Sequence, residues 1–322
     1  MGTDNTPLIS IIMAVYKPNE KWFREQLRSL NEQTYPALEL LICDDCPEFP
    51  VEEKIISENI VNFPFILVRN EKNMGSNKTF ERLTELAGGK YISYCDQDDV
   101  WHSDKVKKMF SVLERTSSPM VCSDLNIIDG NGKLIADSIT KVRKRHVFRE
   151  GEGLAPQLLV SNFVTGCAMM MRADTAKRAV PFVDSLVHDQ WLAICAATEG
   201  RIELIRESLI DYRQHEGNQT GILKGVYDKP SYYNERLIKF LPRLDDYKNR
   251  LYSGNMKTAI DELDAFYHAR IRYSRKMNFK DLKTMLKYKR YSKTGVLVET
   301  AMKFIPAPVF KKIVSLAKKG KI

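Results

Sequence analysis

Short apolar runs alternate with amphipathic stretches through the first hundred residues of this chain. The runs LISIIMAV (8–15), LELLIC (38–43), FILVRN (65–70) and KYISYC (90–95) have the length and composition of buried strands. The stretches between them space apolar residues as helices do, as at Trp22, Phe23, Leu27 and Leu30. This repeated order of strand and helix predicts an α/β fold, in which helices cover both faces of a sheet.

Polar residues follow three of these runs where each run ends. Asp44 and Asp45 follow the second run, Asp96, Asp98 and Asp99 follow the fourth, and AVYKP closes the first. Because the carboxyl ends of parallel strands open into one crevice, we expect these residues to converge. Crowded carboxylates favour a divalent cation, although a solvated acidic turn is the simpler alternative. Neither G-x-G-x-x-G nor G-x-x-x-x-G-K-[ST] occurs, which argues against dinucleotide and P-loop sites.

Cys43 and Cys46 form a C-x-x-C around the two acids of the second run. A redox pair of this spacing begins a helix that lowers a thiol pKa, whereas Cys43 ends a strand beside two carboxylates. No second cysteine pair stands at zinc-finger spacing. We therefore interpret the acids, and not the thiols, as the functional part of this stretch.

The chain divides by charge near residue 221. Residues 223–322 hold 24 Lys or Arg against 9 Asp or Glu, a net charge of +15, while the first 222 residues carry a net charge of −6. We predict a catalytic domain over 1–221 and a basic, mainly helical region over 222–322, which would either attach to an anionic membrane surface or pack on the catalytic domain as a helical lid. The segment 202–215 is expected to form a pair of strands, and Pro306 and Pro308 to break the last apolar stretch into two pieces.

A set of motifs in the first 221 residues resembles the GT-A-fold glycosyltransferases of family 2. The motifs are SIIMAVYKPNEKWFREQLRSLNEQTYPALELLICDD, NEKNMGSNKTF, GKYISYCDQDDVW, TGCAMMM, HDQWL and YRQHEGNQTG. The DQDDVW and YRQH forms look most like bacterial rhamnosyltransferases of cell-surface polysaccharide synthesis. The resemblance implies a Rossmann-like mixed sheet with helices on both faces, followed here by a helical C-terminal extension.

The resemblance assigns the donor site residue by residue. The nucleotide would lie against Ala14, Val15, Tyr16, Asp44, Asp45, Asn73, Gly75 and Lys78, with one acid of the second strand accepting from the base. Lys78 could equally be a charge on a helix surface. Asp96 and Asp98 form the D-x-D signature, in which Asp98 is the more direct ligand of Mg²⁺ or Mn²⁺ and Asp96 lies nearer the ribose. His215 would complete the metal or diphosphate site.

Asp189 matches the catalytic base of the family, which takes a proton from the acceptor hydroxyl during inverting transfer. Its simpler alternative is a helix cap. The acceptor or sugar pocket would include Asp99, Trp101, Gly166, His188, Trp191 and Arg213, although Trp191 could instead be a core residue. The sequence departs from the family pattern after Asp45, where Cys46 and Pro47 replace the usual glycine and hydroxyl residue.

These motifs predict an inverting, metal-dependent glycosyltransferase. The best guess for its donor is dTDP-rhamnose, with a UDP-hexose or UDP-N-acetylhexosamine as the alternative, and its acceptor would be a glycan or a lipid-linked hydroxyl. Neither an export signal nor a membrane-spanning run is recognised, so we expect a cytoplasmic protein at the inner face of the membrane. A nucleic-acid-binding protein using the basic tail is the alternative of another class, and a nucleotidyltransferase is a third; no nucleic-acid partner is expected.

Overall fold

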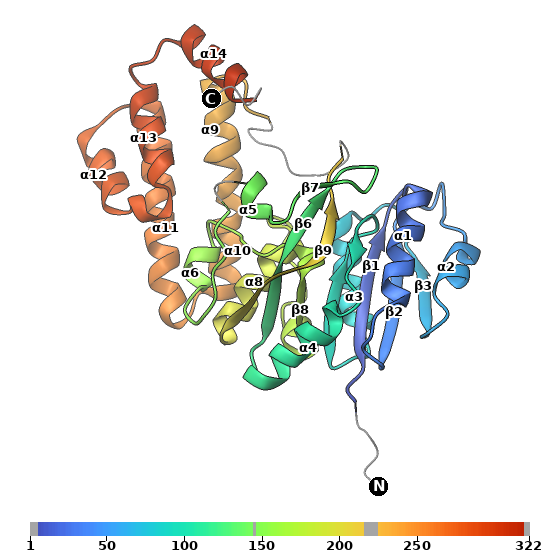
Figure 1. Cartoon of the computed structure of the whole chain (residues 1–322). Coiled ribbons are helices and arrows are strands. Elements are labelled where there is room, and N and C mark those ends of the chain that lie inside the picture. Colours follow the sequence, from blue (N-terminus) through green and yellow to red (C-terminus); the bar gives the residue numbers. More distant parts are fainter. Residues whose placement is uncertain (1–5, 144–145, 216–224, 319–322) are drawn as a thin grey trace. The chain divides into compact units, whose positions relative to one another are not determined.

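A computed structural model describes residues 6–143, 146–215 and 225–318. The chain forms two compact units, Met1–Glu216 and Gly217–Ile322 (Figure 1). The predicted boundary at Gly221 lies outside the described residues, as does the end of the YRQHEGNQTG motif from Glu216 onward.

Four parallel strands form one half of the sheet in the N-terminal unit. They are β1 (Ile9–Val15), β2 (Leu38–Asp44), β3 (Phe65–Arg69) and β4 (Tyr91–Cys95), in the order β3-β2-β1-β4. Each corresponds to one of the four predicted apolar runs. Their alternation with helices is therefore confirmed, and their carboxyl ends lie at one edge.

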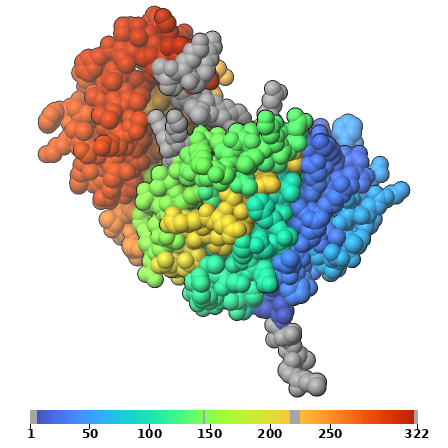
Figure 2. Space-filling model, in the orientation of Figure 1, coloured from blue at the N-terminus to red at the C-terminus, as the bar shows by residue number. Residues whose placement is uncertain are grey.

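The other half of the sheet mixes strand directions. β8 (Met169–Arg172) runs antiparallel to β4 and to β6 (Met120–Ile128), and β7 (Leu134–Ala136) pairs with β6. β9 (Ile202–Arg213) runs parallel to β6 and antiparallel to β5 (Val100–Trp101). In Figure 2 the green surface of the β6 region accordingly lies beside the yellow surface of β9.

The prediction of two strands over 202–215 is wrong, because a single strand, β9, spans Ile202–Arg213. Its pairing with β6 continues across two register shifts, one between Ser123 and Asp124 and one between Asp124 and Asn126. These irregularities lie inside one continuous ladder and do not divide the strand. As a result, the YR of the YRQH motif reaches the sheet edge as strand.

Helices cover both faces of this sheet. The apolar faces of α1 (Glu20–Asn31) and α2 (Glu53–Asn59) pack in the main core with alternate residues of β1 and β2, and α4 (Lys105–Thr116) joins the same core beside β6, β8 and β9. On the other face, Phe80 and Thr84 of α3 (Ser76–Leu86) contact the Tyr94 ring and hydroxyl. The short helices α5 (Ile139–Val142), α6 (Ala155–Leu158) and α7 (Ala173–Arg178) and the longer α8 (His188–Glu199) complete this unit.

The C-terminal unit is helical. Its helices are α9 (Lys229–Arg236), α10 (Leu241–Leu251), α11 (Gly254–Arg275), α12 (Phe279–Lys287), α13 (Lys293–Met302) and α14 (Ala307–Lys318). α13 and α14 are the two pieces that Pro306 and Pro308 predict. In the described ranges, no helix combines the length and the apolar character needed to cross a bilayer.

A buried ion pair joins two helices of this unit. Arg270 of α11 and Glu299 of α13 are 3% and 2% exposed, and the Arg270 guanidinium donates to both oxygens of the Glu299 carboxylate. The guanidinium also lies 4.8 Å from the Phe266 and Tyr267 ring centroids. Removing one partner of such a pair leaves a buried charge without compensation.

We therefore expect Glu299→Ala to destabilise the C-terminal unit by about 3–5 kcal/mol. Urea unfolding, followed by hydrogen exchange in α11 and α13, measures this loss. Glu235→Ala is the matched control, because Glu235 pairs with Lys239 on a solvated helix surface and should cost less than about 1 kcal/mol. Equal losses in the two variants would contradict the assigned role of the buried pair.

Candidate active site

The carboxyl ends of β1, β2 and β4 bring three predicted segments together. Val15 pairs with Asp44 across the β1–β2 ladder, and the Asp45 N–H donates to the Val15 carbonyl at 2.8 Å. Gln97, inside the DQDD loop after β4, accepts from the Tyr16 N–H at 2.8 Å and donates to the Tyr16 carbonyl at 3.2 Å. The predicted convergence of strand ends is therefore present in the structure.

Of the three residues predicted at the nucleotide in and after β1, only Tyr16, which follows the strand, presents its side chain to solvent. Val15 is fully buried, Ala14 is half-buried, and Tyr16 is 43% exposed. The Lys17 ammonium lies 5.3 Å from the Tyr16 ring centroid and 5.2 Å from that of Phe49, which is also exposed. Tyr16 and Phe49 thus offer aromatic surface at this edge.

Asp44 and Asp45 shape the loops around the strand ends. The buried Asp44 carboxylate accepts from the Cys46 and Val51 N–H groups at 3.0 and 2.7 Å, so it orders the turn where the sequence departs from the family pattern. Cys43 and Cys46 are buried free thiols, and burial raises the pKa of Cys43 to about 11. Unreactive thiols beside bonded acids are consistent with our interpretation of the C-x-x-C.

Asp45 bonds the loop that leads into α3. Its carboxylate accepts from the Met74 N–H at 2.7 Å, from the Gly75 N–H at 2.8 Å and from the Asn70 amide at 2.7 Å. Gly75 has a φ of +80°, which a residue with a Cβ rarely adopts. The Asn73 side chain also accepts from the Gly75 N–H, at 2.9 Å.

The predicted nucleotide residues Asp45, Asn73 and Gly75 therefore form one hydrogen-bonded unit. Lys78 is separate from them. Its ammonium pairs with Glu81 at 3.1 Å and with Asp184 at 3.7 Å, which is the helix-surface alternative.

The DQDD loop directs one of its three acids to His215 and the other two to Cys167. Asp98 contacts His215, with 2.6 Å between Oδ2 and Nε2. Asp96 lies instead with Asp99 and Cys167, whose ligating atoms are all within 4.8 Å of one another. Burial, followed by the charges of Asp98 and Asp189, raises the pKa of Asp96 to about 7. Negative charge is thus concentrated at this edge of the sheet.

Asp99 is fully buried, and one of its oxygens accepts from the Arg213 N–H at 2.9 Å. Its other oxygen has no hydrogen-bond partner among the described residues. Burial raises the Asp99 pKa well above the usual range. A sugar-facing role does not fit a side chain with no exposed surface, so its predicted place in the sugar pocket is corrected to a buried support of the loop.

The predicted place of Arg213 in the acceptor pocket is also corrected. Its side chain is 1% exposed, and Nε donates to the Asp98 carbonyl at 2.8 Å. One terminal nitrogen pairs with Glu25 at 2.6 Å, and the other donates to the Asp129 carbonyl at 3.3 Å. The guanidinium is therefore occupied by the protein and does not face a ligand.

Trp101 and Trp191 are core residues as well, at 3% and 1% exposed. The Trp191 indole N–H donates to the Ala179 carbonyl at 2.8 Å, which is the core alternative for this residue. The Lys105 ammonium lies 3.0 Å from the centroid of the Trp101 ring. Neither ring lines a sugar pocket in this structure, because both are covered by neighbouring elements.

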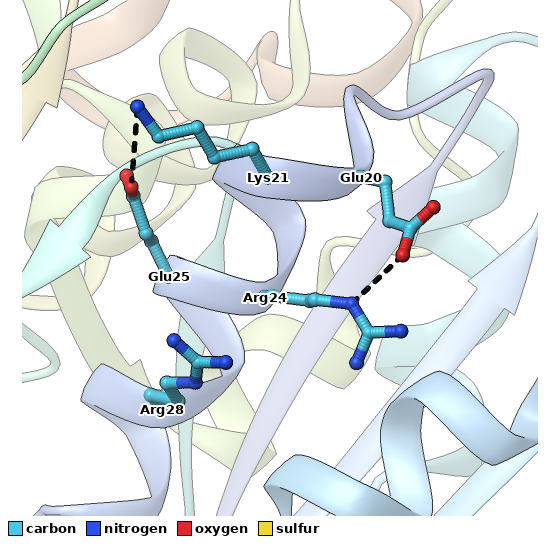
Figure 3. Close-up of a pocket in the computed structure, with 5 residues that line it drawn as sticks. All are labelled: Glu20, Lys21, Arg24, Glu25 and Arg28. Carbon is cyan, nitrogen blue, oxygen red and sulfur yellow. Dashed lines mark hydrogen bonds and ion pairs between the residues drawn. The ribbon is translucent and has the colours of Figure 1, made fainter.

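Figure 3 shows a hollow near Glu25 that lies over the outer face of α1. Charged side chains of this single helix line it, with ion pairs of 2.8 Å between Glu20 and Arg24 and 4.0 Å between Lys21 and Glu25. The predicted site residues are not among its lining residues. The hollow and the acidic loop share one residue, Glu25, because its second carboxylate oxygen pairs with Arg213.

Asp189 lies in the first turn of α8, two residues after the N-cap residue Val187. It is therefore not the N-cap of this helix. Its carboxylate accepts from the Asn162 amide at 3.0 Å and from the Gln190 N–H at 2.5 Å. Burial raises the pKa of Asp189 to about 6, and hydrogen bonds from the Gln190 and Gly166 N–H groups and from Asn162 oppose this rise. A partly buried carboxylate with this pKa is suited to accept a proton near neutral pH.

His188 and Gly166 pack together behind Asp189. The His188 ring lies 4.1 Å from Phe80 and 5.7 Å from Tyr94, and burial lowers its pKa to about 3. A Cβ on Gly166 would stand 2.8 Å from the His188 Nε2. The absence of a side chain at Gly166 thus leaves room for the neutral His188 ring, whereas the sequence predicts that it leaves room for a ligand.

Lys105 is the main residue that the sequence prediction misses. It opens α4, is fully buried, and its ammonium has no hydrogen-bond acceptor within the described ranges. Burial lowers its pKa to about 7, although Cys95, Cys167, Asp99 and Asp96 act to raise it. The HSDK stretch resembles an ordinary solvated helix start, so only packing reveals this cation. Other contributors that were missed are Trp22, Glu25, Gln97 and Asn162.

The Glycosyl transferase family 2 profile matches this chain over residues 10–178. An uncharacterized glycosyltransferase of Methanocaldococcus jannaschii is 26% identical over 220 residues, which are 66% of this chain and 73% of that protein. The dTDP-rhamnosyl transferase RfbG of Shigella flexneri is 29% identical over 231 residues, which are 65% of this chain and 73% of RfbG.

Among solved structures, S. aureus TarS 1-349 in complex with UDP-GlcNAc matches 98% of this chain and 92% of its own, with a TM-score of 0.58 and 15% identity. Against the longer TarS structure, this chain spans half the length. A likeness at this identity supports the fold, while the profile covers more than half of the chain. The chain therefore belongs to glycosyl transferase family 2 and is a glycosyltransferase with the GT-A fold.

Proposed function

We propose that this glycosyltransferase transfers a sugar, with inversion, from a nucleotide-diphosphate donor to a hydroxyl of a glycan or lipid-linked acceptor in surface polysaccharide synthesis. The observation that carries the proposal is the gathering of Asp189, Asp96 and the Asp98–His215 pair at one sheet edge, where the charges of Asp98 and Asp189 act on Asp96. Such an edge combines a base with groups able to hold a charged donor.

Asp189 is the proposed base. The acceptor hydroxyl gives its proton to the Asp189 carboxylate while the hydroxyl oxygen forms a bond to the anomeric carbon. The bond from that carbon to the nucleoside diphosphate breaks at the same time, and its electron pair leaves with the phosphate oxygen. Asn162 orients the carboxylate through its 3.0 Å hydrogen bond.

Asp98 and His215 are the proposed ligands of a divalent ion, Mg²⁺ or Mn²⁺. Their ligating atoms lie 2.6 Å apart, close enough to share one ion, and carboxylate and phosphate oxygens suit these two metals. The His215 ring packs 4.9 Å from the Trp22 ring, which helps to hold it toward Asp98. When bound, such an ion supplies positive charge to the departing diphosphate.

The nucleotide is proposed to lie along the ends of β1 and β2, between Tyr16 and the unit formed by Asp45, Asn73 and Gly75. The Asp45 carboxylate already accepts three hydrogen bonds, and its remaining lone pair could take a base N–H. Asp96 is proposed to lie near the ribose. Asp44 serves this region indirectly, because both of its oxygens are used in the turn.

dTDP-rhamnose is the proposed donor. The 29% identity to a dTDP-rhamnosyl transferase supports it, together with the DQDDVW and YRQH motifs. A UDP-hexose or UDP-N-acetylhexosamine is the alternative, which the likeness to TarS in complex with UDP-GlcNAc supports. The protein is proposed to act at the inner face of the membrane, where its basic C-terminal unit meets anionic lipid.

Asp189→Asn should abolish transfer, because an amide cannot accept the acceptor proton, while nucleotide-sugar binding survives. Titration calorimetry with the donor and a transfer assay separate the two effects. Turnover near the parent rate would show that Asp189 is not the base.

Asp98→Ala should remove metal-dependent donor binding, since it deletes the most direct proposed ligand. Binding of the donor is measured with Mn²⁺ and with EDTA. Asp184→Ala is the control, because Asp184 is 86% exposed and should bind as the parent does. Intact Mn²⁺-dependent binding in Asp98→Ala would refute the ligand assignment.

Asn162→Ala should move the acid limb of the pH–rate profile to higher pH. The Asn162 amide stabilises the ionised Asp189 carboxylate, so its loss raises a pKa that lies at about 6. The base is then protonated over a wider pH range, and we expect the limb to rise by about 1 pH unit. An unchanged limb, or one that moves to lower pH, would contradict the role of this hydrogen bond.

A further inference from the structure

Helix α12 (Phe279–Lys287) carries an apolar face that remains exposed in the folded C-terminal unit. Phe279 is 80% exposed, Leu286 is 50% exposed, and Met277 just before the helix is 55% exposed. Phe279, Leu282 and Leu286 recur at intervals of three and four, so they lie along one side of the helix. Exposing several large apolar side chains in one row is costly in water and indicates a binding surface.

The opposite side of α12 is anchored, so this exposure belongs to an ordered helix. Met285 is fully buried, and the buried Asp281 accepts from Arg272 of α11 at 2.7 Å. Asn278 caps the helix by accepting from the Asp281 N–H at 2.8 Å, and its amide donates back to the Asp281 carboxylate at 2.6 Å. One face of α12 thus docks on α11 while the other faces outward.

Positive charge borders the exposed row. Lys280, Lys283 and Lys287 are exposed, and on a helical projection they occupy the arc beside Phe279 and Leu286. Residues 275–293 contain eight Lys or Arg and one acid, which is the buried and paired Asp281. The outward face of this helix is therefore apolar and basic, without a compensating exposed carboxylate of its own.

We infer that this outward face of α12 is the surface by which the protein docks on a bilayer that contains anionic phospholipid. Phe279 and Leu286 would enter the headgroup region, and the flanking lysines would reach lipid phosphates. The inference rests on the proposed membrane attachment of the C-terminal unit and deepens it, because it assigns that attachment to one helix face of this unit. In α14, Phe310 and Val314 are buried in a cluster with Val226 and Met302, while Val309 and Ile313 are 49% and 38% exposed.

Sedimentation of the full chain with vesicles tests this inference. The parent should bind vesicles of phosphatidylglycerol and phosphatidylethanolamine, and this binding should weaken as the salt concentration rises. It should not bind vesicles of phosphatidylcholine alone. The double variant Phe279→Ser with Leu286→Ser should weaken binding at least tenfold. The triple variant Lys280→Gln, Lys283→Gln and Lys287→Gln should weaken it on the order of a hundredfold. Phe304→Ser is the matched control, since Phe304 is 75% exposed on the neighbouring segment, and it should bind as the parent does.

Several outcomes would overturn the inference. The parent protein could fail to bind anionic vesicles, or could bind phosphatidylcholine vesicles equally well. The α12 variants could bind as the parent does, or Phe304→Ser could lose as much binding as the α12 variants lose. If the face binds a partner protein in place of lipid, the first outcome is expected.

Hydrolysis of the sugar donor without vesicles separates this inference from the proposed glycosyltransferase function. The α12 variants should hydrolyse the sugar donor at the parent rate. Loss of hydrolysis in these variants would show that the face supports the folded enzyme and is not a membrane-binding surface. A parent that binds vesicles but releases no nucleotide would contradict the proposed function alone.

Discussion

The buried contacts of Arg213 hold the acidic loop of this enzyme in place. Its backbone N–H donates to the Asp99 carboxylate, and its Nε donates to the Asp98 carbonyl. One terminal nitrogen pairs with Glu25, and the other donates to the Asp129 carbonyl. One side chain at the end of β9 therefore connects the DQDD loop to α1 and to the turn between β6 and β7. Because the guanidinium is buried while Glu25 is one-third exposed, the position of Asp98 depends on a network that reaches from the loop to the surface of α1.

Below this loop, burial and like charge act together on the carboxylates. Asp96 and Asp189 both have raised pKa values, and the Asp99 pKa is raised further. Lys105 is a buried cation among Cys95, Cys167 and these acids, so part of the compensating charge comes from within the protein. The partly buried pair of Asp98 and His215 is where an external cation and a diphosphate fit the proposed chemistry.

Much of the fold could be predicted from the sequence, because its signals are local. Four apolar runs and the helices between them mark the parallel half of the sheet, and the acids directly after Cys43 and Cys95 mark the edge where strands end. The burial of Trp101 and Arg213 could not be predicted, since it depends on packing between distant segments, and for Trp191 the sequence left a core position and a sugar pocket open. Lys105 and Asn162 were missed for the same reason, and the continuity of β9 depends on its pairing with the distant strand β6. In the C-terminal unit, composition indicates a basic helical region, but only the packing of Met285 and Asp281 shows which face of α12 is free.

The central claim is that this sheet edge binds a nucleotide-sugar through a divalent ion and activates an acceptor beside it. The most direct measurement is release of nucleoside diphosphate by the purified protein from a panel of UDP-, dTDP- and GDP-sugars, with Mn²⁺ and with EDTA. We predict release from one nucleotide class, most rapidly from dTDP-rhamnose, that requires the metal and yields the sugar with inverted anomeric configuration. Release that EDTA leaves unchanged, retained configuration, or no release from any donor would contradict the account.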